Sequence, residues 1–227
     1  MSRLLIQNGR VIDPSQKLDR VTNLLIEGGR IAAFDVESAD GAAALDASGK
    51  IVAPGLIDIH VHLRDPGQEE DETIETGTAA ALAGGFTSIA CCPNTDPPID
   101  SQGTVEYIKQ KAARADNCNV YAIACVSKNR EGKELSEIGQ LVEAGAVGIS
   151  DDGAPVYSPE LLRRAFEYCL MFGIPVMNHP EILELTQNGV MHEGVTQLVL
   201  GLGGIPAAAE DVMVSRDVAL AEATGGR

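Results

Sequence analysis

Side chains that can bind a metal gather in three short motifs of the sequence. His60 and His62 lie one residue apart in GLIDIHVHLRDPG, Asp152 ends GISDD, and His179 ends VMNH. Residues two apart on an extended strand point to the same side, so the first two imidazoles share one space. Neutral imidazoles and a carboxylate form a ligand set suited to Zn²⁺. The pattern predicts a metal site, against the alternative that His60 and His62 are buried core residues.

The two aspartates of GISDDGAP, Asp151 and Asp152, admit two interpretations. Asp-Gly is a frequent turn dipeptide, so the motif can be a plain acidic turn. A carboxylate, however, has two oxygens and can bridge two cations, whereas each imidazole nitrogen serves one. An aspartate beside three histidines is therefore a natural bridging ligand of a two-metal site in which both cations activate one shared water.

Arg64, two residues after His62, and Asn94 in CCPNT are candidates for binding a substrate. A guanidinium grips a carboxylate through two parallel hydrogen bonds, and an amide can add another donor. The alternative is that Arg64 lies on the surface or pairs with the adjacent Asp65. Asp58 we expect to support the strand or the histidines rather than to bind metal.

The remaining reactive side chains are expected to play no part in catalysis. The five cysteines show no CxxC spacing, which indicates reduced thiols. Cys91 and Cys92 lie in an apolar segment with no nearby basic residue to lower a thiol pKa, so neither is expected to be a nucleophile. His192, in a predicted loop, we expect to be solvated or structural.

The elements that must position these residues alternate between short strands and helices from Gly55 onward. The predicted strands span residues 56–62, 87–93, 120–126, 147–152 and 175–179. The predicted helices span residues 70–83, 101–115, 135–144, 159–172 and 206–223. Such alternation indicates βα units and a parallel sheet. In a βα barrel the carboxyl ends of the strands meet on one rim, where the candidate residues would converge.

The first fifty residues have a different sequence pattern. Short β-rich runs bounded by Gly-containing turns suggest a small antiparallel sheet of its own. We expect residues 1–53 to form part of a small β-sandwich. Residues 54–227 would supply about the first five units of a (β/α)8 TIM-type barrel, which usually needs about 250 residues. A complete open sheet is the competing interpretation.

Composition excludes several classes of partner. The chain of 227 residues has 17 Lys and Arg against 33 Asp and Glu, a net charge of −16. This charge repels both nucleic acid and an anionic membrane surface. No apolar run approaches the ~18 residues of a membrane span, and no signal peptide opens the sequence. A cytoplasmic protein without nucleic-acid or membrane partners is expected.

Four motifs together resemble a known family. HVHLRDPG, CPNTDPP, GISDDGAPV and VMNHPE are similar to the dihydroorotases of the amidohydrolase superfamily, specifically the long bacterial type, and the resemblance runs from residue 3 to 227. It implies a metallo-dependent hydrolase that interconverts (S)-dihydroorotate and N-carbamoyl-L-aspartate in pyrimidine biosynthesis. A metal-activated water would attack the ring carbonyl, and an acidic residue would carry its proton to the amide nitrogen.

The resemblance also implies roles for individual residues and partners. One or two zinc ions would bind per subunit, with His60 and His62 on one zinc, Asp152 shared or held by the first, and His179 on the second. Arg64 and Asn94 would hold the substrate carboxylate. A homodimer or an association with aspartate transcarbamoylase is implied. The family's further zinc-binding histidine and its proton-shuttling aspartate are expected beyond Arg227, so no catalytic acid is expected within the chain.

Two other functions compete with this one. Related hydantoinases and dihydropyrimidinases usually bridge their metals with a carbamylated lysine, but no lysine follows Lys133 in this chain. That absence and Arg64 favour a dihydroorotase, because dihydroorotate carries a carboxylate that a hydantoin lacks. The second competitor is a non-catalytic homologue that acts as a partner of aspartate transcarbamoylase.

Overall fold

The computed structural model describes residues 3–227, and the chain divides into two compact units after Gly55. The first unit holds one five-stranded sheet. Its strands are β1 (Arg3–Asp13), β2 (Leu18–Glu27), β3 (Arg30–Phe34), β4 (Ala43–Asp46) and β5 (Ile51–Val52), with a 3-10 turn, η1 (Pro14–Gln16), after β1. Gly28 and Gly29 both have positive φ, which allows the tight turn between β2 and β3.

The antiparallel sheet expected in this unit is only partly correct. The pairs β1–β2 and β2–β3 are antiparallel, but β4 and β5 both pair with β1 in parallel. The reason is the connection through residues 35–42, which returns the chain so that β4 and β5 run in the direction of β1. The described residues of the unit thus form a mixed sheet, ordered β3-β2-β1-β4 with β5 also on β1.

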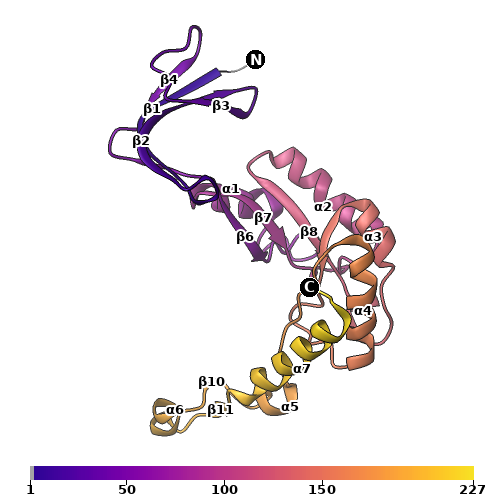
Figure 1. The fold of residues 1–227 in the computed structure, drawn as a ribbon. Helices are drawn as coiled ribbons and strands as arrows, with labels where there is room; N and C mark the ends of the chain where they lie inside the picture. Colours follow the sequence, from indigo (N-terminus) through magenta and orange to yellow (C-terminus); the bar gives the residue numbers. More distant parts are fainter. Residues whose placement is uncertain (1–2) are drawn as a thin grey trace. The chain divides into compact units, whose positions relative to one another are not determined.

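The second unit, Leu56–Arg227, is built on a parallel sheet. Its strands are β6 (Leu56–Val61), β7 (Phe86–Cys91), β8 (Asn119–Ala124) and β9 (Ala146–Ile149), in the spatial order β6-β7-β8-β9. Neighbouring strands are also consecutive in the chain, and a helix connects each pair (Figure 1). The alternation read from the sequence is confirmed for these four βα units.

The fifth strand, expected at residues 175–179, is not formed. Val176 makes a single parallel bridge to Ile149, framed by hydrogen bonds from Ile149 N–H to Pro175 and from Met177 N–H to the Ile149 carbonyl. Because β9 ends at Ile149, the residues after Met177 have no strand to pair with. The segment nevertheless lies beside β9 and carries its polar residues to the same end of the sheet.

The main helices begin and end at residues suited to capping. They are α1 (Ile74–Ala83), α2 (Gln102–Ala115), α3 (Ile138–Ala144) and α4 (Pro159–Phe172). Thr73 and Ser101 form capping boxes at the first two, and Ser158 caps α4 ahead of Pro159. Gly173, at φ +67, ends α4 as expected. The predicted starts of α1 and α3 are four and three residues too early.

Buried apolar residues join the sheet to its helices. One cluster includes Ile74 of α1, Ile89 of β7, Ile108 of α2 and Leu141 of α3, all fully buried. Burial of this kind contributes roughly 1.5–3 kcal/mol for each large aliphatic side chain. The helices therefore hold one face of the sheet in place and leave the strand ends to carry polar residues.

The segment after His179 contains short elements and then a long helix. These are α5 (Leu183–Thr186), β10 (Met191–His192), α6 (Val195–Leu200), β11 (Gly204–Ile205) and α7 (Ala208–Thr224). Leu220 and Ala221 of α7 pack against the buried cluster that includes residues of α4. Arg216 of α7 donates to the carbonyls of Val156 and Tyr157, which ties this helix to the loop after β9. No helix described for residues 3–227 is both long and apolar enough to cross a membrane.

Candidate metal centre

Three imidazoles converge on the carboxylate of Asp152 at the carboxyl end of the parallel sheet. His60 Nε2 and His179 Nδ1 lie 3.6 and 3.5 Å from Oδ1, and His62 Nε2 lies 3.6 Å from Oδ2. These distances are long for hydrogen bonds. Two ligands that each sit about 2.0–2.1 Å from one tetrahedral zinc are roughly 3.3 Å apart. The spacing therefore fits donors that share cations.

Burial makes this arrangement costly without a cation. The Asp152 side chain is only 7% exposed, and among residues 3–227 its carboxylate accepts no hydrogen bond of ordinary length. A buried carboxylate without hydrogen-bond donors is destabilising unless a charge compensates it. The donor set of imidazoles and a carboxylate thus fits a borderline-soft divalent ion such as zinc.

Neighbouring side chains set the orientation of two of the imidazoles. His62 Nδ1 lies 2.9 Å from Asn94 Oδ1, and His179 Nε2 lies 2.9 Å from Glu181 Oε2. With the two oxygens as acceptors, each ring carries its proton on that nitrogen and turns the other nitrogen toward Asp152. Hydrogen bonds from Thr186 and then from His179 lower the pKa of Glu181, which keeps it an acceptor. Metal-binding histidines are oriented in this way.

Asp58 contributes to the strand instead of to the cluster. Its Oδ1 accepts a hydrogen bond of 3.0 Å from the main-chain N–H of His60. This contact agrees with the supporting role expected for it.

Asp151 faces away from the imidazoles, although it adjoins Asp152 in the sequence. Its carboxylate accepts hydrogen bonds from the main-chain N–H and the hydroxyl of Ser127, and it is 1% exposed. Burial raises the pKa of Asp151, and the bonds from Ser127 oppose that rise. Of the two aspartates, only Asp152 reaches the cluster.

A side chain from a neighbouring loop holds the backbone that carries these aspartates. Arg130 donates from Nη2 to the Asp152 carbonyl at 2.6 Å and from Nε to the Asp151 carbonyl at 3.3 Å. Gly153 follows at φ +79, a conformation that favours glycine. Arg130 was not predicted from the sequence, because it belongs to the 3-10 turn η2 (Lys128–Arg130) and has no motif of its own.

Arg64 is not one of the side chains grouped around Asp152, and its backbone is unusual. Its φ is +58, which is uncommon for a residue other than glycine and often marks a functional position. The interpretation that Arg64 pairs with Asp65 is wrong, because Asp65 is buried against Lys111 and Tyr107. Within residues 3–227 the guanidinium has no ion-pair partner and makes only a 3.5 Å contact with Gln68 Oε1.

Cys92, which was not expected to play a part in catalysis, lies in the site. Its Sγ and one ligand atom from each of His60, His62 and Asp152 all lie within 4.8 Å of one another. Burial, and then the charge of Asp152, raises the pKa of Cys92 to about 12, so the free thiol is protonated. The signal in the sequence was the two-residue period of the strand, which puts Cys92 on the opposite face from Cys91.

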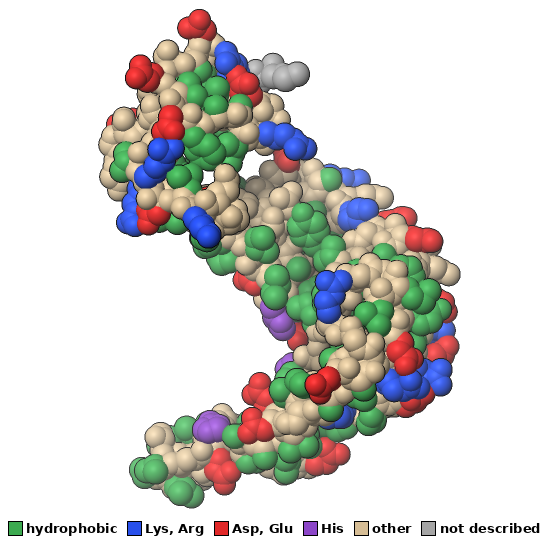
Figure 2. Space-filling view, viewed as in Figure 1, with side chains coloured by type: hydrophobic (Ala, Val, Ile, Leu, Met, Phe, Trp, Pro, Cys, Tyr) green, Lys and Arg blue, Asp and Glu red, His purple; other side chains and the backbone are tan. Residues whose placement is uncertain are grey.

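His192 lies outside the cluster. It is exposed on β10, in agreement with the solvated role expected for it. Figure 2 shows where histidine side chains reach the surface of the second unit, among hydrophobic ones.

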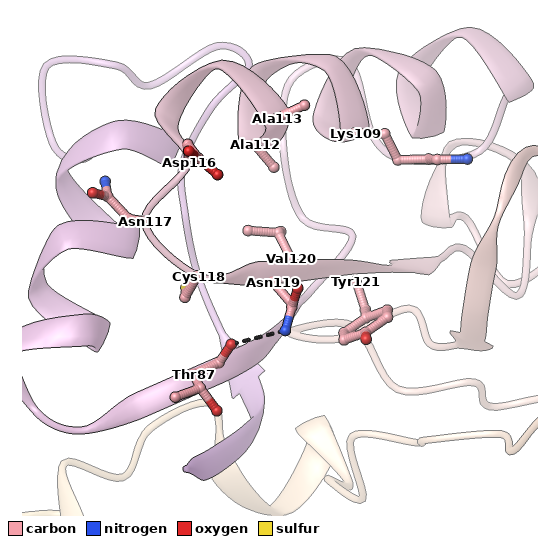
Figure 3. A pocket seen from close by; sticks show the side chains of 10 residues that line it. All are labelled: Thr87, Lys109, Ala112, Ala113, Asp116, Asn117, Cys118, Asn119, Val120 and Tyr121. Carbon is pink, nitrogen blue, oxygen red and sulfur yellow. Dashed lines mark hydrogen bonds between the residues drawn. The ribbon is translucent and has the colours of Figure 1, made fainter. Parts of the chain in front are cut away.

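A shallow hollow of about 490 Å³ lies away from these histidines, at the start of β8 and the end of α2 (Figure 3). Lys109, Asp116 and Cys118 line it, and Asn119 Nδ2 closes one side with a hydrogen bond to the Thr87 carbonyl. In Figure 3 the polar side chains do not converge on one point. The hollow lies at the amino end of its strand, whereas sites in βα sheets form at the carboxyl ends.

Comparison with known proteins agrees with this architecture. Residues 49–227 match the family model described as dihydro-orotase-like. A putative dihydroorotase of Rhodopirellula baltica is 48% identical over 226 residues, covering 98% of this chain and 50% of that protein. A dihydroorotase of Acetivibrio thermocellus is 52% identical over 223 residues, covering 97% of this chain and 52% of that protein. The chain therefore spans about half the length of the curated relatives it matches.

Solved structures give the same fold. An L-hydantoinase from Arthrobacter aurescens superimposes with a TM-score of 0.81 at 23% identity, covering 100% of this chain and 52% of that one. A D-hydantoinase from Thermus sp. gives a TM-score of 0.66 at 28% identity, covering 98% of this chain and 50% of that one. The fold of the chain is thus that of about half a hydantoinase.

Proposed function

The chain belongs to the dihydro-orotase-like family, and we propose that it forms the N-terminal portion of a zinc-dependent dihydroorotase. The reaction is the reversible interconversion of (S)-dihydroorotate and N-carbamoyl-L-aspartate. The observation that carries the proposal is the convergence of three imidazoles on the buried carboxylate of Asp152. Sequence identities of 48% and 52% to proteins named putative dihydroorotase and dihydroorotase support this choice of substrate.

We assign the two units of the chain to two different domains. Residues 1–53 form part of a small β-sandwich, and residues 54–227 form the first part of a TIM-type amidohydrolase barrel. The parallel order β6-β7-β8-β9 and the likeness to hydantoinases support the barrel. The protein works in the cytoplasm, as a homodimer or in association with aspartate transcarbamoylase.

The geometry around Asp152 supports a set of proposed metal ligands. His60 and His62 would hold one zinc and His179 the second, with Asp152 shared by both ions or held by the first. Bound zinc supplies a polarised ring carbonyl and a water that is nucleophilic at neutral pH. Asn94 and Glu181 keep the lone pairs of His62 and His179 aimed at the ions through their 2.9 Å contacts.

Arg64 and Asn94 hold the carboxylate of the substrate. Arg64 is half-buried and unpaired within residues 3–227, so its guanidinium is available for a bidentate contact. Asn94 can act twice, because its Oδ1 faces His62 while its amide protons remain free to donate. These contacts orient the ring so that its amide carbonyl faces the metal cluster.

A hydantoinase-like activity is the second candidate, since the solved structures of this fold named above are hydantoinases. Their substrates carry no carboxylate for Arg64 to bind. A panel of dihydroorotate, dihydrouracil and hydantoin separates the two activities. Preference for dihydroorotate that disappears in Arg64→Met supports the dihydroorotase, whereas preference for a ring without a carboxylate supports the alternative.

The decisive experiment uses the full gene product. Zinc content and dihydroorotate hydrolysis are measured for the wild type, His60→Ala and His62→Ala. We expect one or two zinc ions per subunit in the wild type, and loss of both metal and turnover in the variants. A wild type without metal and without turnover would overturn the proposal and favour a non-catalytic partner of aspartate transcarbamoylase.

A further inference from the structure

Cys92 places a sulfur donor beside the proposed metal ligands. Its side chain is 2% exposed, next to Ala90, Ile123 and Met177 on the inner face of the sheet. Its Sγ lies within 4.8 Å of a ligand atom on His60, on His62 and on Asp152. Neither the proposed reaction nor the substrate contacts use this thiol.

The neighbouring cysteine shows that the placement is specific to one face of β7. Cys91 is equally buried, but it packs in the cluster between the sheet and its helices, with Ile89 and Ile108. Successive residues of a strand alternate between the two faces of the sheet. The chain thus offers a matched control, one residue away, that has the same chemistry and burial but does not face the metal cluster.

A second feature of the same place points to a cation. The Asp152 carboxylate is 7% exposed and has only imidazole nitrogens at 3.5 Å or more as its nearest polar partners among the described side chains. This buried carboxylate is aimed into the space that Cys92 also faces. Donors on one zinc lie about 3.3–3.8 Å apart, so a displacement on the order of 1 Å brings the sulfur into range.

We propose that Cys92 Sγ is a further donor to the metal position held by His60, His62 and Asp152. The site then takes thiophilic divalent cations, such as Zn²⁺, Co²⁺ and Cd²⁺, in preference to Mn²⁺ or Mg²⁺. The S–H proton leaves to solvent as the metal–sulfur bond forms. This inference rests on the metal site of the proposed function and adds a ligand to it.

Cobalt substitution tests the inference without reference to activity. The full gene product is freed of metal and titrated with Co²⁺ alone, as wild type, Cys92→Ser and Cys91→Ser. Sulfur-to-cobalt charge transfer absorbs in the near ultraviolet, while the visible bands report bound cobalt whatever its ligands. We expect the charge-transfer band in the wild type and Cys91→Ser, and its loss in Cys92→Ser with the visible bands retained.

The outcomes separate this inference from the proposed function. If the wild type shows visible bands but no charge-transfer band, cobalt binds without sulfur and the role of Cys92 is overturned. The same conclusion follows if Cys92→Ser keeps a charge-transfer band equal to that of the wild type. In both cases the metal site itself remains. No visible bands in any protein overturns the metal site itself, and the inference falls with it. Cys92→Val, which removes the donor and leaves a somewhat larger apolar side chain, replaces Cys92→Ser if the latter does not fold.

A competition between cations gives a second measurement. We expect the preference for Cd²⁺ over Mn²⁺ to fall about tenfold or more in Cys92→Val, because a soft donor has been removed. Cys91→Val is the control and should keep the preference of the wild type. An unchanged preference in Cys92→Val would contradict the proposal.

Discussion

Asn94 Oδ1 lies 2.9 Å from His62 Nδ1, and the opposite nitrogen of the same ring faces Asp152 at 3.6 Å. Asn94 follows β7, whereas His62 follows β6, so two adjacent strands fix one imidazole. The same amide is proposed to donate to the substrate. This contact therefore links binding of the metal to binding of the substrate.

Removal of the contact between Asn94 and His62 should weaken the binding of both the metal and the substrate. In Asn94→Ala we expect metal affinity to fall about tenfold to a hundredfold, because the acceptor that orients His62 is lost. Chelator competition measures the affinity, and the KM for dihydroorotate reports the substrate. Asn94→Asp is the matched variant: it keeps an acceptor for His62 but loses the amide donor, so it should retain metal and still raise KM. Full metal affinity in Asn94→Ala would contradict the orienting role.

Arg64 should matter for the substrate alone. Loss of a charge-assisted hydrogen bond costs about 1.5–3 kcal/mol, so Arg64→Met should raise KM about tenfold to a hundredfold. Metal content should not change, because the guanidinium lies outside the ligand set. Arg164→Met, which removes an exposed arginine paired with Glu160 on α4, is the control and should leave both quantities unchanged. Loss of zinc in Arg64→Met would show that the assignment is wrong.

Substitutions of the adjacent residues Asp151 and Asp152 should have different effects. Asp152→Ala should lose most of the bound metal, since no anion then offsets the repulsion between the cations. Asp151→Ala should retain metal in the folded protein but lower the free energy of unfolding by about 1–3 kcal/mol, because the Ser127 donors are left without their acceptor. Metal analysis and urea unfolding measure the two effects. Equal loss of metal in both variants would contradict this division.

How far the sequence predicts this site depends on strand geometry. The two-residue period and the convergence of strand ends were sufficient to bring His60, His62, Asp152 and His179 together. The same period also places Cys92 in the site. The lack of a basic neighbour argues against a nucleophilic thiolate, but it does not argue against a metal ligand.

The parts that were predicted incorrectly depend on partners distant in the sequence. Residues 175–179 have the apolar pattern of a strand, yet a strand needs a neighbour, and β9 ends at Ile149. The parallel pairing of β4 and β5 with β1 likewise depends on the direction of a connection, which local turn residues do not specify. Arg130 reaches the carbonyls of Asp151 and Asp152 from a neighbouring loop, and no residue spacing in the sequence indicates this contact.

A buried ionic group ties the loop of Arg64 to the helices. Asp65 is 1% exposed and accepts hydrogen bonds from the Tyr107 hydroxyl at 2.7 Å, Lys111 Nζ at 3.3 Å and the main-chain N–H of Ile74 at 3.3 Å. The last contact lies at the start of α1, where an anion is also favoured by the helix dipole. The residue next to Arg64 is thereby fixed to both α1 and α2.

Loosening this anchor should affect both stability and substrate binding. Tyr107→Phe removes one hydrogen bond and should lower the free energy of unfolding by about 1 kcal/mol. Asp65→Ala removes three and should cost about 3 kcal/mol, with a higher KM for dihydroorotate, because the loop no longer holds Arg64 in its left-handed conformation. Metal content should stay constant in both, since neither residue touches the ligands. Tyr121→Phe is the control, because Tyr121 lies on the rim of the hollow at the start of β8 and should leave stability and KM unchanged. A KM unchanged in Asp65→Ala would show that Arg64 is positioned without this anchor.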